Sequence, residues 1–149
     1  MPAPIHVPDR APSHLETAGQ LVLLTTLPRP CGCTALTAAK IIGETAGIDR
    51  FRSKDSFARH NGTAPRPVWS SNHARHRLSR TGNRQLNAAI HRIALTQARC
   101  HEDARVLLAR RKAGGDGGME ALRVLKRRLS DVVFRAMVAD QSSLINLAA

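Results

Sequence analysis

A short basic segment of the chain, residues 70–84, combines the residue types that phosphoryl-transfer chemistry requires. Two adjacent serines, Ser70 and Ser71, are followed within this segment by two histidines and four arginines. A serine that attacks phosphorus needs nearby cations, because these favour the ionised hydroxyl and hold the phosphate charge in the transition state. Arginine suits this task because its planar fork matches two phosphate oxygens. From composition alone, the simpler alternative is favoured, in which the segment is a basic loop that only grips backbone phosphates.

A second candidate phosphate site is the turn at Cys31-Gly32-Cys33 and the helix that follows it. The apolar residues, glycine turn and short helical segment between Thr26 and Ala39 resemble one helix-hairpin-helix unit. In such a unit, a tight turn directs backbone N–H groups and a helix N-terminus at a phosphate. Gly32 would let the backbone approach closely, while Thr34 stands where a second glycine is expected. An ordinary turn before a core helix explains the same pattern equally well.

Positive charge is concentrated in the middle of the chain. The 149 residues carry a formal net charge of +12, and the isoelectric point is about 11.4. Between Arg50 and Arg128 there are 19 basic and 5 acidic residues, whereas the rest of the chain is slightly acidic. Such a field attracts polyanions, and its local character favours a binding face. Because there are only 3 Phe, 1 Trp and no Tyr, we expect arginine contacts to phosphate rather than stacking on bases.

Cysteine usage and hydropathy indicate the cellular setting. The 3 cysteines are an odd number without a CxxC pair, which argues against a disulfide framework and fits the bacterial cytoplasm, with the protein at the nucleoid. Apolar runs such as Leu21–Leu24 are too short to span a membrane, and the proline-rich start of the chain lacks the apolar core of a signal peptide. A zinc site from Cys31, Cys33, His73 and His76 is disfavoured, because CxC and HxxH match the usual ligand spacings poorly.

Hydrophobic periodicity and capping signals predict an all-α fold. We expect helices over Thr34–Thr45, Lys54–His60, Arg84–Arg99, Glu102–Lys112 and Met119–Asp140. Ser53 is a typical N-cap, and the last helix gives the strongest signal because its apolar residues recur at three-and-four spacing. The polar, basic stretch from Pro65 to Arg80 is expected to be a loop or extended chain that connects two helices.

Basic and histidine side chains on these helices have more than one interpretation. The clusters Arg110–Lys112 and Lys126–Arg128 either contact nucleic acid or form solvated helix faces. His91 lies beside the apolar stripe of its helix, so a structural histidine explains it more readily than a catalytic base.

Five short motifs occur in order along the chain. They are Leu36-Thr37-Ala38-Ala39-Lys40, Arg50-Phe51-Arg52-Ser53, Asn61-Gly62-Thr63-Ala64-Pro65, Arg75-His76-Arg77-Leu78 and Gly82-Asn83-Arg84-Gln85-Leu86-Asn87-Ala88-Ala89. Together they resemble the C-terminal domain of the insertion sequence 110/116/902 transposase family, over a stretch from about Leu36 to Asp140. Members of this family cut and rejoin DNA. The resemblance therefore implies a serine-dependent transposase that is guided by a structured RNA from its own element.

The resemblance also implies roles for particular residues. The family serine lies eight residues ahead of the apolar residue in the Arg-His-Arg-Leu motif, and counting back from Leu78 gives Ser70. The family places a glycine directly after this serine, where this chain has Ser71, which stays the second candidate nucleophile. The residues expected to contact nucleic acid are Gly32 from the turn and, on the family motifs, Lys40, Arg75, Arg77, Arg80, Asn83 and Arg84.

A further implication concerns a missing part. Family members pair this serine-bearing domain with an N-terminal, nuclease-like domain, whose carboxylates would bind a divalent metal, magnesium in our expectation. Before Leu36 this chain has only the acids Asp9 and Glu16. We therefore expect a truncated transposase that holds no cofactor and does not transpose alone. The expected organisation is a disordered leader over residues 1–20, the transposase domain over 21–140 and a tail over 141–149.

The sequence thus predicts the DNA-binding C-terminal part of a serine-dependent transposase. Its expected partners are DNA, a structured guide RNA, and a second copy of the chain or a full-length transposase, with no membrane association. Two alternatives remain open. One is a basic nucleic-acid-binding module without chemistry, and the other is a basic structural or ribosome-associated protein, which only isoelectric point and size favour.

Overall fold

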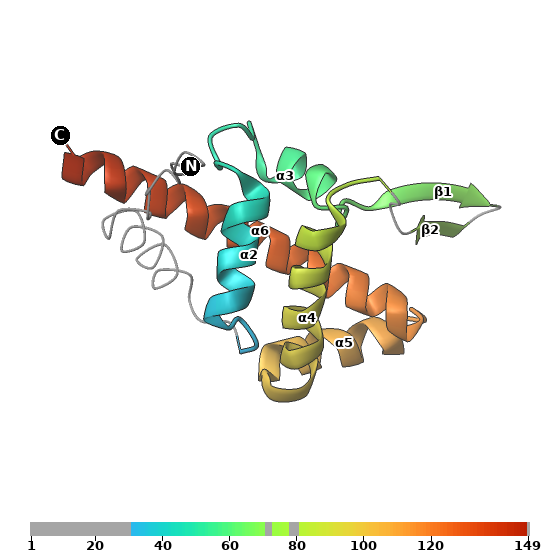
Figure 1. The fold of residues 1–149 in the computed structure, drawn as a ribbon. Helices are drawn as coiled ribbons and strands as arrows, with labels where there is room; N and C mark the ends of the chain where they lie inside the picture. Colours follow the sequence, from blue (N-terminus) through green and yellow to red (C-terminus); the bar gives the residue numbers. More distant parts are fainter. Residues whose placement is uncertain (1–30, 71–72, 78–80, 149) are drawn as a thin grey trace, which may run out of the picture.

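A helical body and one projecting hairpin make up the computed structural model, which describes residues 31–70, 73–77 and 81–148, with the strands described by their backbone (Figure 1). The elements are α2 (Ala35–Thr45), α3 (Lys54–His60), β1 (Arg66–Ser70), β2 (His73–Arg77), α4 (Arg84–Cys100), α5 (Glu102–Ala113) and α6 (Gly118–Ala148). The expectation of an all-α body with a long C-terminal helix is confirmed. The hairpin is an addition, since its residues were expected to form a loop or extended chain.

Side-chain caps fix where three of the helices begin. Thr34 precedes α2 and its hydroxyl accepts a hydrogen bond from the backbone N–H of Thr37, at 3.3 Å. Ser53 caps α3 in the same way, through the N–H of Ser56. Asn83 caps α4, where its side-chain oxygen accepts from two backbone N–H groups, each at 2.9 Å. These caps satisfy donors that a helix cannot pair internally, and they lie where short polar residues precede the apolar periodicity.

The core lies around α4, which packs against α2, α5 and α6. One face of α4 is fully buried through Leu86, Ile90 and Ile93. The helix α6 also covers α3, where Phe57 is buried and lies edge-on to Phe51, with ring centroids 5.3 Å apart. Burial of such side chains is the main stabilising contribution to a helical body of this size.

The helix α6 is longer than its sequence pattern predicts. It continues eight residues past Asp140, through the stretch expected to be a tail, and its end extends beyond the other helices (Figure 1). The apolar residues of this extension are not buried, since Ile145 and Leu147 are exposed. The periodicity that marks the buried part of the helix therefore ends before the helix does.

The strands β1 and β2 form an antiparallel two-stranded sheet. Arg66 pairs with Arg77 at the inner end, next to the helices, and Ser70 pairs with His73 at the outer end. The hairpin projects away from the helical body (Figure 1). The segment is thus an arm, and its outer end is the part of the arm farthest from the core.

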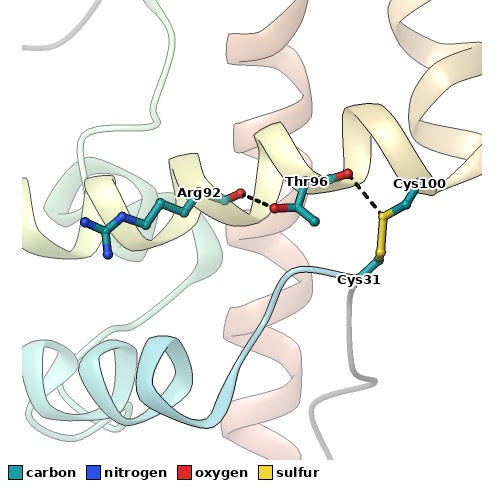
Figure 2. Close-up of a disulfide and its surroundings, with 4 residues drawn as sticks. All are labelled: Cys31, Arg92, Thr96 and Cys100. Carbon is teal, nitrogen blue, oxygen red and sulfur yellow. Dashed lines mark hydrogen bonds between the residues drawn. A yellow bond between two sulfur atoms is a disulfide. The ribbon is translucent and has the colours of Figure 1, made fainter.

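One disulfide joins Cys31, before α2, to Cys100 at the end of α4, across a sequence separation of 69 (Figure 2). The cysteine count, which argued against a disulfide framework, did not predict this bond. Its spacing in sequence carried no signal, because the fold alone brings the two positions together. The turn at Gly32 packs tightly beside them: a Cβ on this glycine, whose φ is +96°, would lie 2.5 Å from the Thr96 Cβ.

Candidate nucleic-acid interface

Of the two candidate nucleophiles, Ser70 lies at the outer end of the hairpin. Ser70 is the last residue of β1, whereas Ser71 lies outside the described residues. Arg75 and Arg77 are on β2, at the register positions opposite Val68 and Arg66. Arg80 also lies outside the described residues. The hairpin therefore brings Ser70 and two of the predicted cations onto one two-stranded arm.

The two segments that enter and leave the arm meet at its root. The N–H of Asn83 donates to the carbonyl of His60 at 2.6 Å. Gly82 has a φ of +132°, and a Cβ there would lie 2.9 Å from both the Gly62 nitrogen and the His60 oxygen. Only glycine permits this backbone approach. The glycines of two family-like motifs thus pack against each other and fix where the arm starts.

A buried amide holds the entering segment in place. Asn61 is fully buried, and its Nδ2 donates to the Ser130 hydroxyl of α6 at 2.7 Å. Its Oδ1 accepts from the N–H and the hydroxyl of Thr63, at 3.0 and 2.6 Å. Asn87 of α4 then donates through Nδ2 to the backbone oxygen of Asn61, at 2.7 Å. A network of buried hydrogen bonds like this one favours a single geometry.

Asn83 and Arg84, two of the predicted contact residues, lie at this root. The Asn83 side chain caps α4 and its Nδ2 donates to the Glu44 carboxylate at 2.6 Å. Its hydrogen-bonding groups are therefore engaged within the protein. Arg84, the first residue of α4, lines an adjacent cleft.

This cleft lies between the root of the arm, α4 and α6, and its volume is about 720 Å³. Its lining consists of Asn61, Gly62, Thr81, Gly82, Asn83, Arg84, Asn87, Ala88, His91, Met119, Leu122, Arg123 and Lys126. The titratable members of this lining are all basic. Clefts of roughly 300–1,000 Å³ are the usual size for ligand sites, and cations around such a hollow raise the local concentration of anions.

Lys126 is the most buried cation of the cleft, with 7% of its surface exposed. Its Nζ donates to Oδ1 of Asn87 at 2.7 Å. Burial, and then the charge of Arg123, lower the pKa of Lys126. Burial and the charge of Lys126 in turn lower the pKa of His91. For Lys126, the interpretation as part of a solvated helix face is therefore wrong, because α6 packs this side against α4.

The other candidate contact residues lie in different environments from Lys126. Arg127 pairs with Asp55 and Asp131. Gly32 lies in the turn before α2, and its tight contact with Thr96 already explains the glycine. Lys40 is half-buried on α2. The segment that precedes the turn of the expected helix-hairpin-helix unit lies outside the described residues. Only the turn and the helix after it are described.

Within residues 31–70, 73–77 and 81–148, no group of three or more His, Cys, Asp or Glu side chains could hold a metal ion. Cys31 is in the disulfide and provides no thiolate. None of the helices in the described part of the chain is long and apolar enough to cross a membrane.

Lys126 belongs to a basic cluster that the sequence offers as a possible nucleic-acid contact, but its grouping with Arg123 and Asn87 is not predicted from the sequence. Asn87 lies within a family-like motif, but its bond to Lys126 joins positions 39 residues apart. The one available signal was a lysine at an inward position of the α6 pattern. A buried lysine needs a partner, so such a position is a candidate for a polar site.

The comparison with known proteins gives the family. The model of the transposase IS116/IS110/IS902 family matches residues 23–108 of this 149-residue chain. The match begins before the Leu36 at which we placed the start of the resemblance, and it ends before α6. A search of curated proteins gave no match. Since the matched stretch spans more than half of the sequence and carries α2, α3, the hairpin and α4 in order, the chain belongs to the transposase IS116/IS110/IS902 family.

Proposed function

We propose that this chain binds DNA along its basic arm and supplies Ser70 as the nucleophile of a strand-transfer reaction in transposition. The observation that supports this most is the strand register, in which Ser70 lies at the outer end of a projecting hairpin. A residue at the end of an arm can reach a DNA backbone that the helical body does not itself contact. The basic cleft at the root supplies a second point of attraction.

The proposed chemistry is a transesterification at phosphorus. The Ser70 oxygen forms a bond to phosphorus while the bond from phosphorus to one sugar oxygen breaks. The serine hydroxyl gives up its proton to water and the departing sugar oxygen takes one up. The product is a phosphoserine ester that retains the energy of the phosphodiester bond, so a second sugar hydroxyl can reverse the step on another strand. Arg75, Arg77, Arg80 and Arg84 are the cations proposed to share the phosphate charge.

The proposal includes a second domain for full activity. The family resemblance implies a nuclease-like domain with a divalent metal, magnesium in our proposal, so this chain by itself is proposed not to transpose. Choice of the target is proposed to lie with a structured guide RNA, because phosphate contacts alone carry no sequence information. The site of action would be the DNA of the nucleoid.

Binding of wild-type chain to DNA is the first measurement. The affinity should fall steeply between about 50 and 200 mM salt, by roughly 10³-fold if six or more phosphates are contacted. A chain that shows no salt-dependent affinity for DNA, and instead co-purifies with ribosomes, would contradict the proposal in both its parts.

The second measurement traps the covalent link. DNA carrying the ends of the element is mixed with the chain and with a nuclease-like family domain supplied in trans, and adducts are separated under denaturing conditions. We expect an adduct with wild-type chain and with Ser71→Ala, and a loss of roughly 10³-fold or more in Ser70→Ala. DNA binding without an adduct under every condition would instead favour a module that binds without chemistry, which the basic cleft alone would also support.

A further inference from the structure

Lys126 carries a charge that the described part of the chain does not neutralise. It is 93% buried by surface area, since 7% remains exposed, and its Nζ donates to a neutral amide oxygen of Asn87. No carboxylate within the described ranges pairs with it, although Arg105, Arg111 and Arg127 make four ion pairs in the same part of the chain. A buried cation without an anion is costly, so the position indicates a site that an anion from outside completes.

The surroundings of Lys126 indicate what kind of anion this is. Arg84 and His91 from α4 and Arg123 from α6 line the same cleft. The cleft has no acidic member in its lining and is open to the root of the arm. Several cations around one hollow match a doubly or singly charged phosphate better than a carboxylate, which one arginine would satisfy.

We propose that the cleft at the root of the arm holds one phosphodiester of the DNA backbone, with Lys126 as its innermost ligand. This inference rests on the proposed DNA binding and adds a specific binding site for one phosphate in this cleft, which we call the seat. It concerns α6, which lies beyond the residues matched by the family model. A strand rises about 3.3 Å per residue, so Ser70 lies roughly 13 Å beyond Arg66 at the inner end of β1, or about four base-pair steps along a duplex.

Two variants of α6 test the seat. Lys126→Met removes the charge and keeps much of the volume, and Arg128→Met is its matched control, because position 128 is exposed and lies about 200° around the helix from position 126. We expect the affinity for a DNA duplex to fall about tenfold in Lys126→Met and at most about twofold in Arg128→Met. The salt dependence of Lys126→Met should decrease by about one phosphate contact.

A measurement on the wild-type chain, the titration of His91, tests the seat even if Lys126→Met fails to fold. The pKa of His91 is lowered by burial and by Lys126. A phosphate bound beside these two side chains should therefore raise the pKa of His91. We expect the pKa of His91, followed by NMR titration of its imidazole, to rise when duplex DNA is bound. Circular dichroism of both variants shows which of them can be compared with wild type.

The outcomes separate this inference from the proposed function. If wild-type chain does not bind DNA, the proposed function fails and the seat fails with it. If it binds DNA but both variants lose affinity equally and the His91 titration does not move, DNA binding stands and the seat is wrong. If the chain binds RNA more tightly than a DNA duplex of the same length, the seat belongs to RNA and the proposal of a DNA phosphodiester is wrong. Competition by inorganic phosphate at millimolar concentration would support a phosphate seat only together with the loss in Lys126→Met.

Discussion

Two charged side chains on α6 are buried, and each bears on stability differently. Lys126 has an amide partner and lies on the cleft. Asp140 is 4% exposed, and its Oδ2 has no hydrogen-bond partner among the described residues. Burial raises the pKa of Asp140. An acid whose pKa is raised by folding stabilises the folded chain below its unfolded pKa, and this contribution is lost as the pH rises through the folded pKa.

Asp140→Asn should therefore stabilise the protein near neutral pH. We expect a gain of about 1 kcal/mol at pH 7, which shrinks as the pH falls and disappears by about pH 2, where the acid of the unfolded chain is also protonated. Urea unfolding at the two pH values measures it. Asp131→Asn is the control on the same helix, and because Asp131 pairs with Arg127 it should give no gain. A gain in Asp140→Asn that is equal at both pH values would show that burial of the charge is not the cause.

Single residues of the candidate site could be predicted from sequence to different degrees. Ser70 is predicted by counting back from a family-like motif, and its role stays a prediction. Asn83 and Arg84 belong to another such motif. Lys126 could not be reached in this way, because its environment depends on how α6 packs against α4. Contacts between positions far apart in the chain leave no periodic trace in either segment.

The hairpin depends on the close contact of two glycines at its root. Gly82→Ala should destabilise the protein by about 3 kcal/mol, because the added Cβ would meet backbone atoms at 2.9 Å and the φ of +132° disfavours a side chain. Gly115→Ala is the matched control, since Gly115 also has a positive φ, +94°, but open space around it. Its cost should be about 1 kcal/mol. Equal losses in urea unfolding would mean that the contact at the root carries no weight.

The helices and the hairpin differ in how well sequence predicts them. All five described helices begin within one residue of the predicted start, and in three of them a polar cap precedes the apolar periodicity. The helix α3 keeps both of its predicted ends. The strands could not be predicted with the same rules. Pro67 lies within β1, and residues 71–72 between the strands are Ser-Asn rather than a glycine turn, so neither alternation nor turn chemistry pointed to pairing.

At the level of the whole molecule, the disulfide constrains nearly half of the chain. It closes a loop with a sequence separation of 69, and bridges of this kind stabilise mainly by restricting the unfolded chain. We expect reduction, or Cys100→Ser, to lower the free energy of unfolding by about 2–4 kcal/mol. Denaturant unfolding with and without reductant measures this. Cys33→Ser is the control, because Cys33 is free; if reductant destabilises Cys100→Ser as much as wild type, the bridge is not responsible.

The disulfide also has a topological consequence. The disulfide closes a covalent ring that includes α2, α3, both strands and α4. The helices α5 and α6 follow Cys100 in the chain and lie outside this ring. The projecting arm therefore lies on a covalent ring (Figure 1). A single cut in the arm would open this ring without dividing the molecule, so the seat on α6 and the two halves of the arm would stay on one covalent chain.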